Sequence, residues 1–335
     1  MTIIEKRYII IGNYKSKPAE GMEVITTKIT NCLNTNKQAK AISISPKQLA
    51  IKLFNIVQYR PSHIVFTHGP GNGVLFWSRV LYLLTYAKIT FICSRPNLES
   101  SPQWLLSLAK THAIFAGSPS HKLKHIARKN RIRITECIIG IDLERLRSKK
   151  LNKNYHKTII DNFFPTTPDS PLLLHVGHIR NNRNLTELIS IKQQLRESVN
   201  ILLIASPSLS ENQKLRTSLE KAGVVIHDEH IADLSTYYCA ADLYLFPILN
   251  NSRGAIDLPL TVIEALSLGL PVVSTRFGIL CDVLSDYNGI RFCKSDCFSQ
   301  QVISIIEKNQ YKDVIPDPLP AEFDLKTLAS KIAEL

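Results

Sequence analysis

Short apolar runs rich in β-branched residues recur along this chain, with stretches long enough for a helix between them. They lie at residues 7–13, 39–45, 63–69, 88–94 and 113–118, and again at 172–177, 201–206, 224–228, 242–247 and 271–275. The runs are continuously apolar rather than alternating, a pattern typical of parallel strands that helices cover on both faces. The chain is therefore predicted to form two doubly wound, Rossmann-like α/β domains.

The length of 335 residues also favours two domains, each with a core of its own. The stretch FFPTTPDSP at 163–171 contains three prolines, which cannot continue a helix, and it resembles an interdomain linker. We therefore expect an N-terminal domain at 1–167, a C-terminal domain at 168–320 and an amphipathic helix at 321–335. The carboxyl ends of both sheets would face one cleft, where ligands of open α/β sheets bind.

The composition is that of a soluble globular protein, with 44% hydrophobic and 21% charged residues. The seven cysteines are scattered and lack zinc-type spacing, which predicts reduced thiols in a cytoplasm and no metal site. The N-terminus lacks a continuous apolar signal segment, and no stretch reaches the roughly 18 apolar residues of a membrane span. The most apolar stretch, at 74–87, is interrupted by Ser78 and Arg79 and is expected to be a buried helix.

The formal net charge is +13, and much of the excess lies between residues 120 and 157, where twelve lysines and arginines accompany three acidic residues. Such a segment suits an anionic partner: the inner leaflet of a membrane, a phosphorylated lipid or nucleic acid. A solvated basic face without a partner is the alternative. Nucleic acid is disfavoured, because Tyr155 is the only aromatic residue in the basic run and stacking on bases needs several.

The stretch DLPLTVIEALSLGLPVVST at 257–275 has the signals of a short helix followed by a strand. Asp257 or Leu258 can cap the helix, Pro259 is preset for its first turn, and Gly269 suits the position after its last turn. A helix from about residue 259 to the residue before Gly269 is therefore predicted.

This predicted helix carries a lone carboxylate, Glu264, among apolar residues. The amides of Leu260 and Thr261 would have no acceptors within the helix, so its first turn is an anion site. A carboxylate in apolar surroundings needs hydrogen-bond donors, and a pair of ribose hydroxyls would supply two. Pairing with an arginine, or exposure to solvent, is the alternative for Glu264.

Three segments follow one another in the second half: HVGHIRNNRNL at 175–185, DLSTYYCAADLYLFP at 233–247 and the 257–275 stretch. In this order they resemble the diphosphate motif, the Tyr-x-x-Ala-Asp segment and the Glu-x7-Glu motif of the donor domain of family-four, retaining glycosyltransferases. That family has the GT-B fold of two Rossmann-like domains. The resemblance covers most of residues 170–310 and implies that the C-terminal domain binds a nucleoside-diphosphate sugar.

By this resemblance the donor nucleotide and its diphosphate would contact a defined set of residues. The set is Gly177, His178, Arg183, Asp257, Leu260, Thr261 and Glu264.

The chain departs from the family's pattern at several of these positions. His178 stands where arginine is usual, Arg183 where lysine is usual, and Ile256 where the first glutamate is usual, with Asp257 one residue away. Arg183 keeps the positive charge, whereas an unperturbed histidine is mostly neutral at pH 7. Arg183 would therefore carry most of the stabilisation of the leaving diphosphate.

The N-terminal half resembles the acceptor domain of the family in fewer residues. HIVFTHGPG at 63–71 matches its strand end at His68, and Gly21 is what remains of its Gly-Gly loop. Where the family often has a histidine after the fourth strand, this chain has Ser94, Arg95 and Pro96. The acceptor-side candidates are thus Gly21, His68 and Arg95, and a purely structural, hydrogen-bonded His68 is the alternative.

The resemblance implies a metal-independent, retaining glycosyltransferase with catalytic residues His68, Arg183 and Glu264. Its co-substrate would be a nucleoside-diphosphate sugar, with no cofactor, and its acceptor a hydroxyl of a glycan or lipid-linked molecule in polysaccharide or lipopolysaccharide synthesis. The enzyme would be cytoplasmic or peripheral on the inner face of the membrane. A sugar-nucleotide epimerase of the same fold and a non-catalytic GT-B partner subunit are the alternatives.

Overall fold

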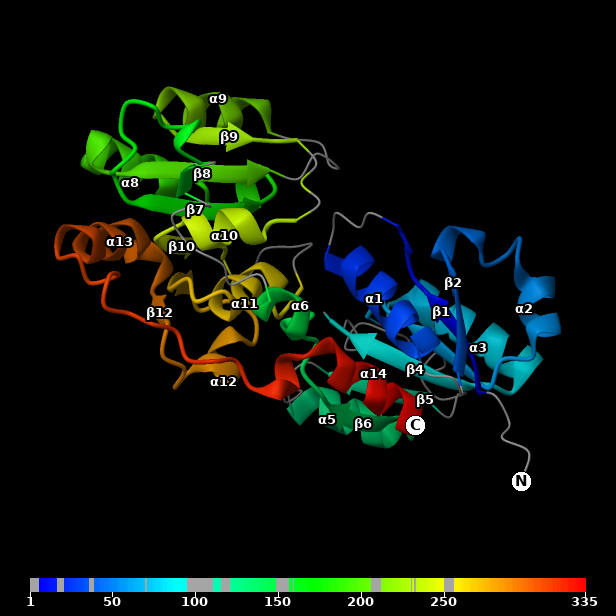
Figure 1. Cartoon of the computed structure of the whole chain (residues 1–335). Coiled ribbons are helices and arrows are strands. Elements are labelled where there is room, and N and C mark those ends of the chain that lie inside the picture. Colours follow the sequence, from blue (N-terminus) through cyan, green and yellow to red (C-terminus); the bar gives the residue numbers. More distant parts are fainter. Residues whose placement is uncertain are drawn as a thin grey trace. The chain divides into compact units, whose positions relative to one another are not determined.

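Two six-stranded, wholly parallel sheets form the frame of the protein (Figure 1). The computed structural model describes residues 6–16, 21–35, 39–69, 71–94, 111–115, 121–148, 157–158, 160–205, 212–229, 231, 233–249 and 256–335. The chain divides into two compact units. Unit 1 comprises Met1–Gly140, Ile256–Leu258 and Ala321–Leu335, and unit 2 comprises Ile141–Ala255 and Pro259–Pro320.

The sheet of unit 1 has the strand order β2-β1-β3-β4-β5-β6. Its strands are β1 (Lys6–Ile11), β2 (Ala39–Ile44), β3 (His63–Phe66), β4 (Lys88–Cys93), β5 (Thr111–Phe115) and β6 (Arg133–Glu136). The helices are α1 (Gly21–Thr35), α2 (Leu53–Tyr59), α3 (Asn72–Thr85), α5 (His121–Lys129) and α14 (Leu325–Glu334). One core cluster joins β-strand residues to α2, α3 and α5, whereas α14 packs against α1. Helices therefore cover both faces of this sheet, as a parallel sheet requires.

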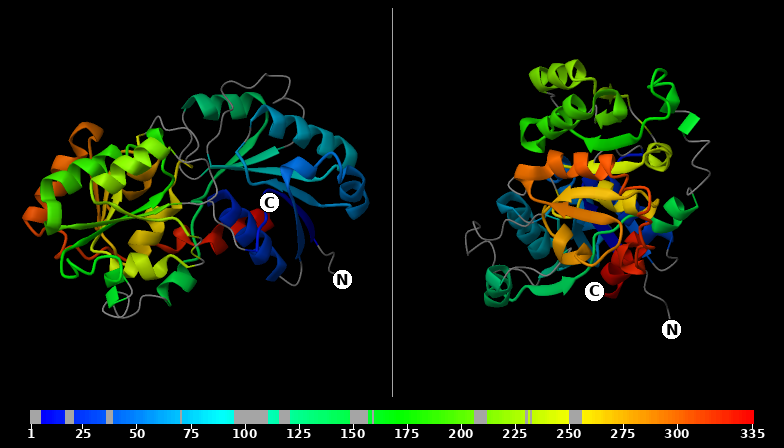
Figure 2. Two further views of the ribbon diagram at one scale, coloured as in Figure 1. Left: turned by 90° about the horizontal axis from the view of Figure 1, so that it is seen from above. Right: turned by 90° about the vertical axis from the view of Figure 1, so that its left-hand side faces the viewer.

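The sheet of unit 2 has the strand order β12-β11-β10-β7-β8-β9. Its strands are β7 (Leu172–Gly177), β8 (Asn200–Ala205), β9 (Val225–His227), β10 (Leu243–Phe246), β11 (Val272–Thr275) and β12 (Ile290–Cys293). The helices are α6 (Leu143–Arg147), α8 (Thr186–Leu195), α9 (Gln213–Lys221), α10 (Ser235–Ala240), α11 (Leu260–Ser267), α12 (Leu280–Leu284) and α13 (Phe298–Glu307). Helices α8, α9 and α13 share one core cluster, α10 contacts β7, and α11 contacts β10 and β11. Figure 2 shows the ribbon in two further views, with helices on both sides of this sheet.

The predicted pair of Rossmann-like α/β domains is confirmed, and each apolar run lies in or overlaps a strand. Sequence analysis missed β6 and β12, whose segments RITE and IRFC contain charged residues. Both are edge strands, and a sheet edge tolerates charged side chains because one of its sides stays open to solvent.

The proline-rich stretch at 163–171 packs within unit 2 and does not mark the division between the units. Asn200, the first residue of β8, exchanges side-chain hydrogen bonds with Thr167, and its N–H donates to Pro171 O. The units divide near Gly140, and residues 321–335 belong to unit 1. Proline content predicted an irregular segment here, but it carried no information about which core the segment joins.

The apolar stretch at 74–87 forms helix α3, as predicted, but it is only half buried. Leu75 and Leu81 lie in the core, while Phe76, Leu83 and Leu84 keep 48%, 63% and 47% of their surface exposed. No helix in the described part of the chain is long and apolar enough to cross a membrane.

A tight approach of α1 to the strand ends makes Gly12 a packing constraint. A Cβ at Gly12 would lie 2.2 Å from Thr67 Oγ1 and 2.4 Å from Thr26 Oγ1, and these two hydroxyls are hydrogen-bonded to each other. We expect Gly12→Ala to lower the melting temperature by several degrees, because overpacking costs about 1–3 kcal/mol.

Gly73→Ala is the matched control for this measurement. A Cβ at Gly73, in α3, would meet no atom within 4 Å. This variant should keep or raise the melting temperature, since alanine favours a helix over glycine by up to about 1 kcal/mol. Equal melting temperatures for both variants would contradict the packing argument.

Candidate functional site

The candidate donor residues of unit 2 gather at the carboxyl edge of its sheet. Strands β7 and β10 are parallel neighbours, so the segments that follow them leave the same edge. Gly177 ends β7, Arg183 lies in the short 3-10 turn that comes next, and α11 follows β10. Arg183 is buried, with 4% of its surface exposed, so its guanidinium is held inside the unit rather than in solvent.

Glu264 lies on α11 and is half buried beside a tyrosine hydroxyl. The Tyr238 hydroxyl donates to Glu264 Oε2 across 3.4 Å, and Tyr238 itself is 1% exposed. Burial and the neighbouring carboxylate raise the pKa of Tyr238, so its hydroxyl keeps its proton and remains a donor. A donor from the protein thus accounts for part of what a carboxylate in apolar surroundings needs.

A second buried tyrosine ties α11 to the end of β7. The Tyr244 hydroxyl donates to Val176 O at 3.4 Å and is hydrogen-bonded to the side chain of Thr261. The rings of Tyr238 and Tyr244 lie 5.7 Å apart, and burial raises the pKa of Tyr244 as well. Both tyrosines therefore fix the first turns of α11 against the strand that ends in Gly177.

The first turn of α11 differs from the prediction at its cap. Pro259 occupies the N-cap position itself, with extended backbone and no side-chain cap, so neither Asp257 nor Leu258 caps the helix. Val262 N–H and Ile263 N–H donate to Pro259 O, which leaves the Leu260 and Thr261 amides ahead of the first intrahelical bond. The predicted stop is confirmed, with Gly269 at a φ of 81°.

His175 is a buried histidine of the candidate site that sequence analysis did not single out. Its Nδ1 lies 2.8 Å from Leu245 O, and because a carbonyl only accepts, Nδ1 carries the proton. Burial, together with the positive Arg183 and the neighbouring His178, lowers the pKa of His175 to about 4. The ring is therefore neutral at pH 7, and Nε2 is an acceptor without a hydrogen-bond partner in the described part of the chain.

The His175 ring also explains why residue 177 is a glycine. A Cβ at Gly177 would lie 2.9 Å from His175 Nε2, closer than real Cβ contacts allow. Because Gly177 has no side chain, a ligand could approach the backbone at the end of β7 directly.

The candidate acceptor residues of unit 1 lie at the carboxyl edge of its own sheet. His68 follows β3, and its Nδ1 is 3.4 Å from Thr67 Oγ1; burial lowers the pKa of His68, which keeps the ring neutral at pH 7. Gly21 is the first residue of α1, and the Thr26–Thr67 hydrogen bond of 2.8 Å joins α1 to the same strand end. The structure thus places Gly21 and His68 on segments that this hydrogen bond joins. Arg95 lies outside the described residues.

Asp257 differs from the other predicted donor residues because it belongs to unit 1. Its N–H donates to Ser94 O at 2.9 Å, just beyond β4. Ile256, at the position of the family's first glutamate, is in the same short segment. Sequence alone could not show this, because both residues are only a few positions from α11 along the chain.

The basic segment at 120–157 is divided between the two units. Its part up to Gly140, with α5, belongs to unit 1, and its part from Ile141, with α6, belongs to unit 2. In α6, Arg145 forms ion pairs with Asp142 and Asp233, and Arg147 donates to Leu319 O. Both arginines therefore make contacts within unit 2.

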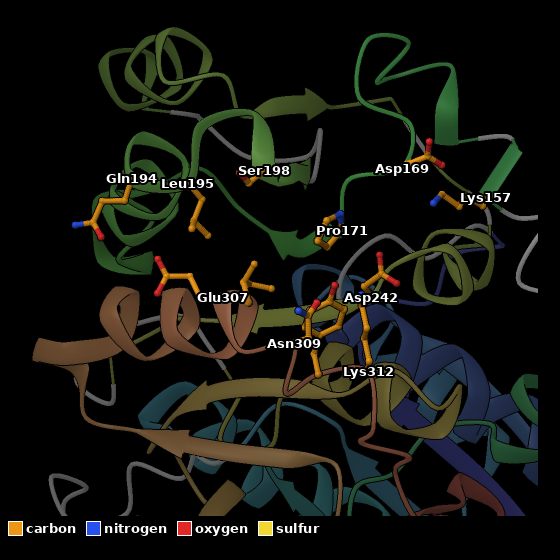
Figure 3. A pocket seen from close by; sticks show the side chains of 12 residues that line it. Lys157, Asp169, Pro171, Gln194, Leu195, Ser198, Asp242, Glu307, Asn309 and Lys312 are labelled. Carbon is orange, nitrogen blue, oxygen red and sulfur yellow. The ribbon is translucent and has the colours of Figure 1, made fainter.

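Two cavities of unit 2 lie at the other edge of its sheet. One of about 610 Å³ is lined by residues that precede strands, Pro171, Ser198 and Asp242, together with Glu307 and Lys312 (Figure 3). The second, of about 360 Å³, shares Asp242 and Lys312. Gly177 lines neither cavity. The candidate site is therefore identified by the chemical nature of its residues and by the edge at which the parallel strands end, and not by a cavity.

Residues 170–308 match the family model described as glycosyl transferases group 1. The sulfoquinovosyl transferase SQD2 of Arabidopsis thaliana is 31% identical over 36% of this chain and 22% of its own length. The capsular polysaccharide biosynthesis glycosyltransferase CapM of Staphylococcus aureus is 25% identical over 58% of this chain and 53% of its own length. The chain thus spans about half or less of the length of these curated relatives.

Solved structures extend the likeness over nearly the whole chain. HepE of Anabaena in complex with UDP-glucose has a TM-score of 0.67 at 14% identity, covering 97% of this chain and 94% of that one. Sucrose-phosphate synthase of Thermosynechococcus elongatus has a TM-score of 0.65 at 13% identity, covering 98% and 94%. The fold is therefore that of the GT-B glycosyltransferases, with two parallel sheets flanked by helices.

The neutral His175 makes the stability of unit 2 depend on pH. Its folded pKa of about 4 lies below the usual 6.5, so the unfolded chain binds the proton first as the pH falls. Stability is full above about pH 6.5 and falls between there and pH 4, by on the order of 3 kcal/mol. We expect His175→Asn to flatten this dependence, measured by urea unfolding between about pH 7 and pH 5.

His125→Asn, at an exposed position of α5, is the matched control and should keep the wild-type slope. Burial also lowers the pKa of His63 in unit 1 to about 4, so some dependence should survive in both variants. An unchanged slope in His175→Asn would contradict the neutral, buried state of the ring.

Proposed function

We propose that the protein is a glycosyltransferase that moves a sugar from a nucleoside-diphosphate sugar to an acceptor hydroxyl. The observation that carries this proposal is the arrangement of Arg183, Glu264 and the first turn of α11 at one edge of a sheet. That sheet lies in the segment that matches the glycosyl transferases group 1 family. The chemical logic is that two anionic phosphates and two ribose hydroxyls need cationic, amide and carboxylate partners, respectively.

Arg183 and the α11 amides would stabilise the departing diphosphate. As the bond between the sugar and the diphosphate breaks, negative charge grows on the phosphate oxygens. The guanidinium of Arg183 and the Leu260 and Thr261 N–H groups supply positive charge without a metal ion. Because Arg183 is buried, its charge is weakly screened, which strengthens this contribution.

Glu264 would bind the two ribose hydroxyls, and Tyr238 would orient its carboxylate. The Tyr238 hydroxyl donates to Oε2, which holds the carboxylate in one orientation. His178 and Gly177 would lie along the diphosphate, and Asp257 would contribute from the segment before α11.

The acceptor side is assigned to His68, Gly21 and Arg95 of unit 1. A neutral His68 ring can accept a hydrogen bond from the acceptor hydroxyl. As the bond between the sugar and the diphosphate breaks, the acceptor oxygen would form the new bond to the sugar and its proton would pass to the His68 ring. Retention of the anomeric configuration and independence of metal ions belong to this proposal by resemblance to family-four enzymes.

The comparisons support a polysaccharide or glycolipid role for this chemistry. CapM is named for capsular polysaccharide biosynthesis, and HepE has been solved with UDP and glucose. We propose an acceptor that is a glycan or a lipid-linked molecule, met in the cytoplasm or at the inner face of the membrane. UDP is accordingly the first nucleotide to test.

A non-catalytic GT-B partner subunit is the second candidate, favoured by one observation. Ile256 replaces the first glutamate of the donor motif, so one carboxylate of the family's pair is missing. Such a subunit would bind nucleotide without turning over any donor.

Nucleotide binding is the first test of this proposal. UDP, GDP, ADP and CDP are compared by thermal shift on wild type, Glu264→Ala and the control Glu307→Gln, which alters the cavity at the opposite edge. A nucleotide at a hundred times its Kd stabilises by about 2.7 kcal/mol, which raises the melting temperature by several degrees. We expect one nucleotide to stabilise wild type and Glu307→Gln but not Glu264→Ala; loss in Glu307→Gln alone would place the nucleotide in the cavity instead.

Turnover by Arg183 variants separates the two candidate functions. With the stabilising nucleotide as the sugar carrier, release of nucleoside diphosphate is measured with and without added glycan acceptors. Arg183→Ala should lower kcat by about 100-fold or more, and Arg183→Lys by about tenfold or less, because lysine keeps the charge but not the planar geometry. Binding without turnover in wild type would favour the partner subunit, and epimerised donor without acceptor would favour an epimerase.

A further inference from the structure

Helix α3 carries almost no charge on any side. Its 14 residues include one side chain that is charged at neutral pH, Arg79, and that side chain is buried with 5% of its surface exposed. Its outward side presents Phe76 and Leu83, seven residues apart and hence on one face, with Leu84 beside them. Surface helices of globular proteins normally have charged or polar outer faces, so an apolar outer face indicates a surface that something covers.

The inner side of α3 is already occupied by the core. Leu75 and Leu81 belong to a cluster that includes Ile56 of α2 and Ala127 of α5. The three helices therefore cover the same face of the sheet of unit 1, and their outer sides point away from it (Figure 1). Rotation of α3 to bury Phe76 or Leu83 would take Leu75 and Leu81 out of the core.

Helix α2 adds further apolar groups to this outer side of unit 1. Phe54 in its first turn is 69% exposed, and Ile51 just before it is 84% exposed. Leu53 and Ile56 of the same segment pack into the core cluster, so α2 also places apolar residues both inside and outside.

The charged residues of α2, α3, α5 and the segments between β2 and β4 are basic, and the acidic Glu136 of β6 pairs with Lys124 of α5. No aspartate or glutamate occurs between Glu23 and Glu99, while Lys47 and Arg60, close to the two ends of α2, are exposed. Helix α5, HKLKHIARK, has no acidic residue either, and its Arg128 and Lys129 are exposed. An apolar surface within a positive field matches an anionic lipid bilayer, whose interior is apolar and whose head groups are negative.

We propose that the outer side of α2, α3 and α5 is a lipid-binding surface that docks unit 1 on anionic bilayers. In this lipid-binding surface Phe54, Phe76, Leu83 and Leu84 enter the interfacial region of the bilayer, while Arg128 and the basic residues around it contact the head groups. A second copy of the chain fits less well, because a two-fold contact would bring two surfaces of the same positive charge together. The proposal stands whether or not the chain transfers sugars, since the proposed nucleotide-binding residues Arg183 and Glu264 lie in unit 2.

Vesicle flotation of the full chain tests this surface. Vesicles of phosphatidylcholine with phosphatidylglycerol are compared with pure phosphatidylcholine, each at low and high salt. The test variant combines Leu83→Glu with Leu84→Glu, and the control is Ile315→Glu, an equally drastic change at a side chain of unit 2 that is 73% exposed. We expect wild type and the control to float with anionic vesicles at low salt, and the double variant to partition at least about tenfold less.

A second double variant, Leu83→Gln with Leu84→Gln, removes the apolar surface without adding charge. It should also lose at least about tenfold in partition, while Arg128→Glu with Lys129→Glu should weaken binding and reduce its salt dependence. Circular dichroism and the melting temperature show that each variant is folded.

Three outcomes would overturn the proposal. If the wild-type protein floats with neither kind of vesicle at low salt, it has no lipid-binding surface. Folded glutamine variants that bind as wild type would show that the outer side of α3 is not the contact. Concentration-dependent dimers of wild type in sedimentation, lost in the glutamine variant without any lipid binding, would assign the surface to a second copy.

Discussion

Parallel strand pairing is the constraint on which the rest of the structure depends. Both sheets are wholly parallel, so all the strands of a sheet end at the same edge and each connection must cross back over a face. Gly177 and Glu264 are far apart in the sequence, yet they share an edge because β7 and β10 are neighbours. The same rule sends the other connections to the opposite edge, where the cavity near Asp242 lies.

Burial determines the protonation state of the polar side chains at the carboxyl edge of the sheet of unit 2. Tyr238 and Tyr244 lose almost all contact with water and keep their protons, so they act as donors toward α11 and β7. Burial lowers the pKa of His175 to about 4, so the ring beside the buried Arg183 stays neutral even in mildly acidic solution. A buried positive charge and a half-buried carboxylate therefore follow neighbouring strands at one edge of the sheet, an arrangement suited to a ligand that carries both anionic and hydroxyl groups.

Sequence patterns predicted the features that repeat and missed those that depend on packing partners. Continuous apolar runs predicted most strands, because strands buried on both faces leave little room for polar residues. The edge strands β6 and β12 escaped this signal, as did the N-cap position of Pro259 and the membership of Asp257 in unit 1. His175 had a detectable signal, a histidine within the apolar run LLLHVG, but its tautomer and its contact with position 177 required the fold.

The helices of unit 1 show how one element can serve two environments. In α3 the residues that contact the sheet, Leu75 and Leu81, fix its orientation, so the side chains on its outer face are free of any packing requirement within unit 1. Exposed leucines there do not stabilise a monomer in water and favour association. Their concentration on one helix, whose charged residue Arg79 is buried, therefore needs a compensating environment. The carboxyl edge of the sheet lies at the strand ends, whereas this outer face lies across the strands. Changes to the surface that meets a bilayer can therefore leave His68 and its strand end undisturbed.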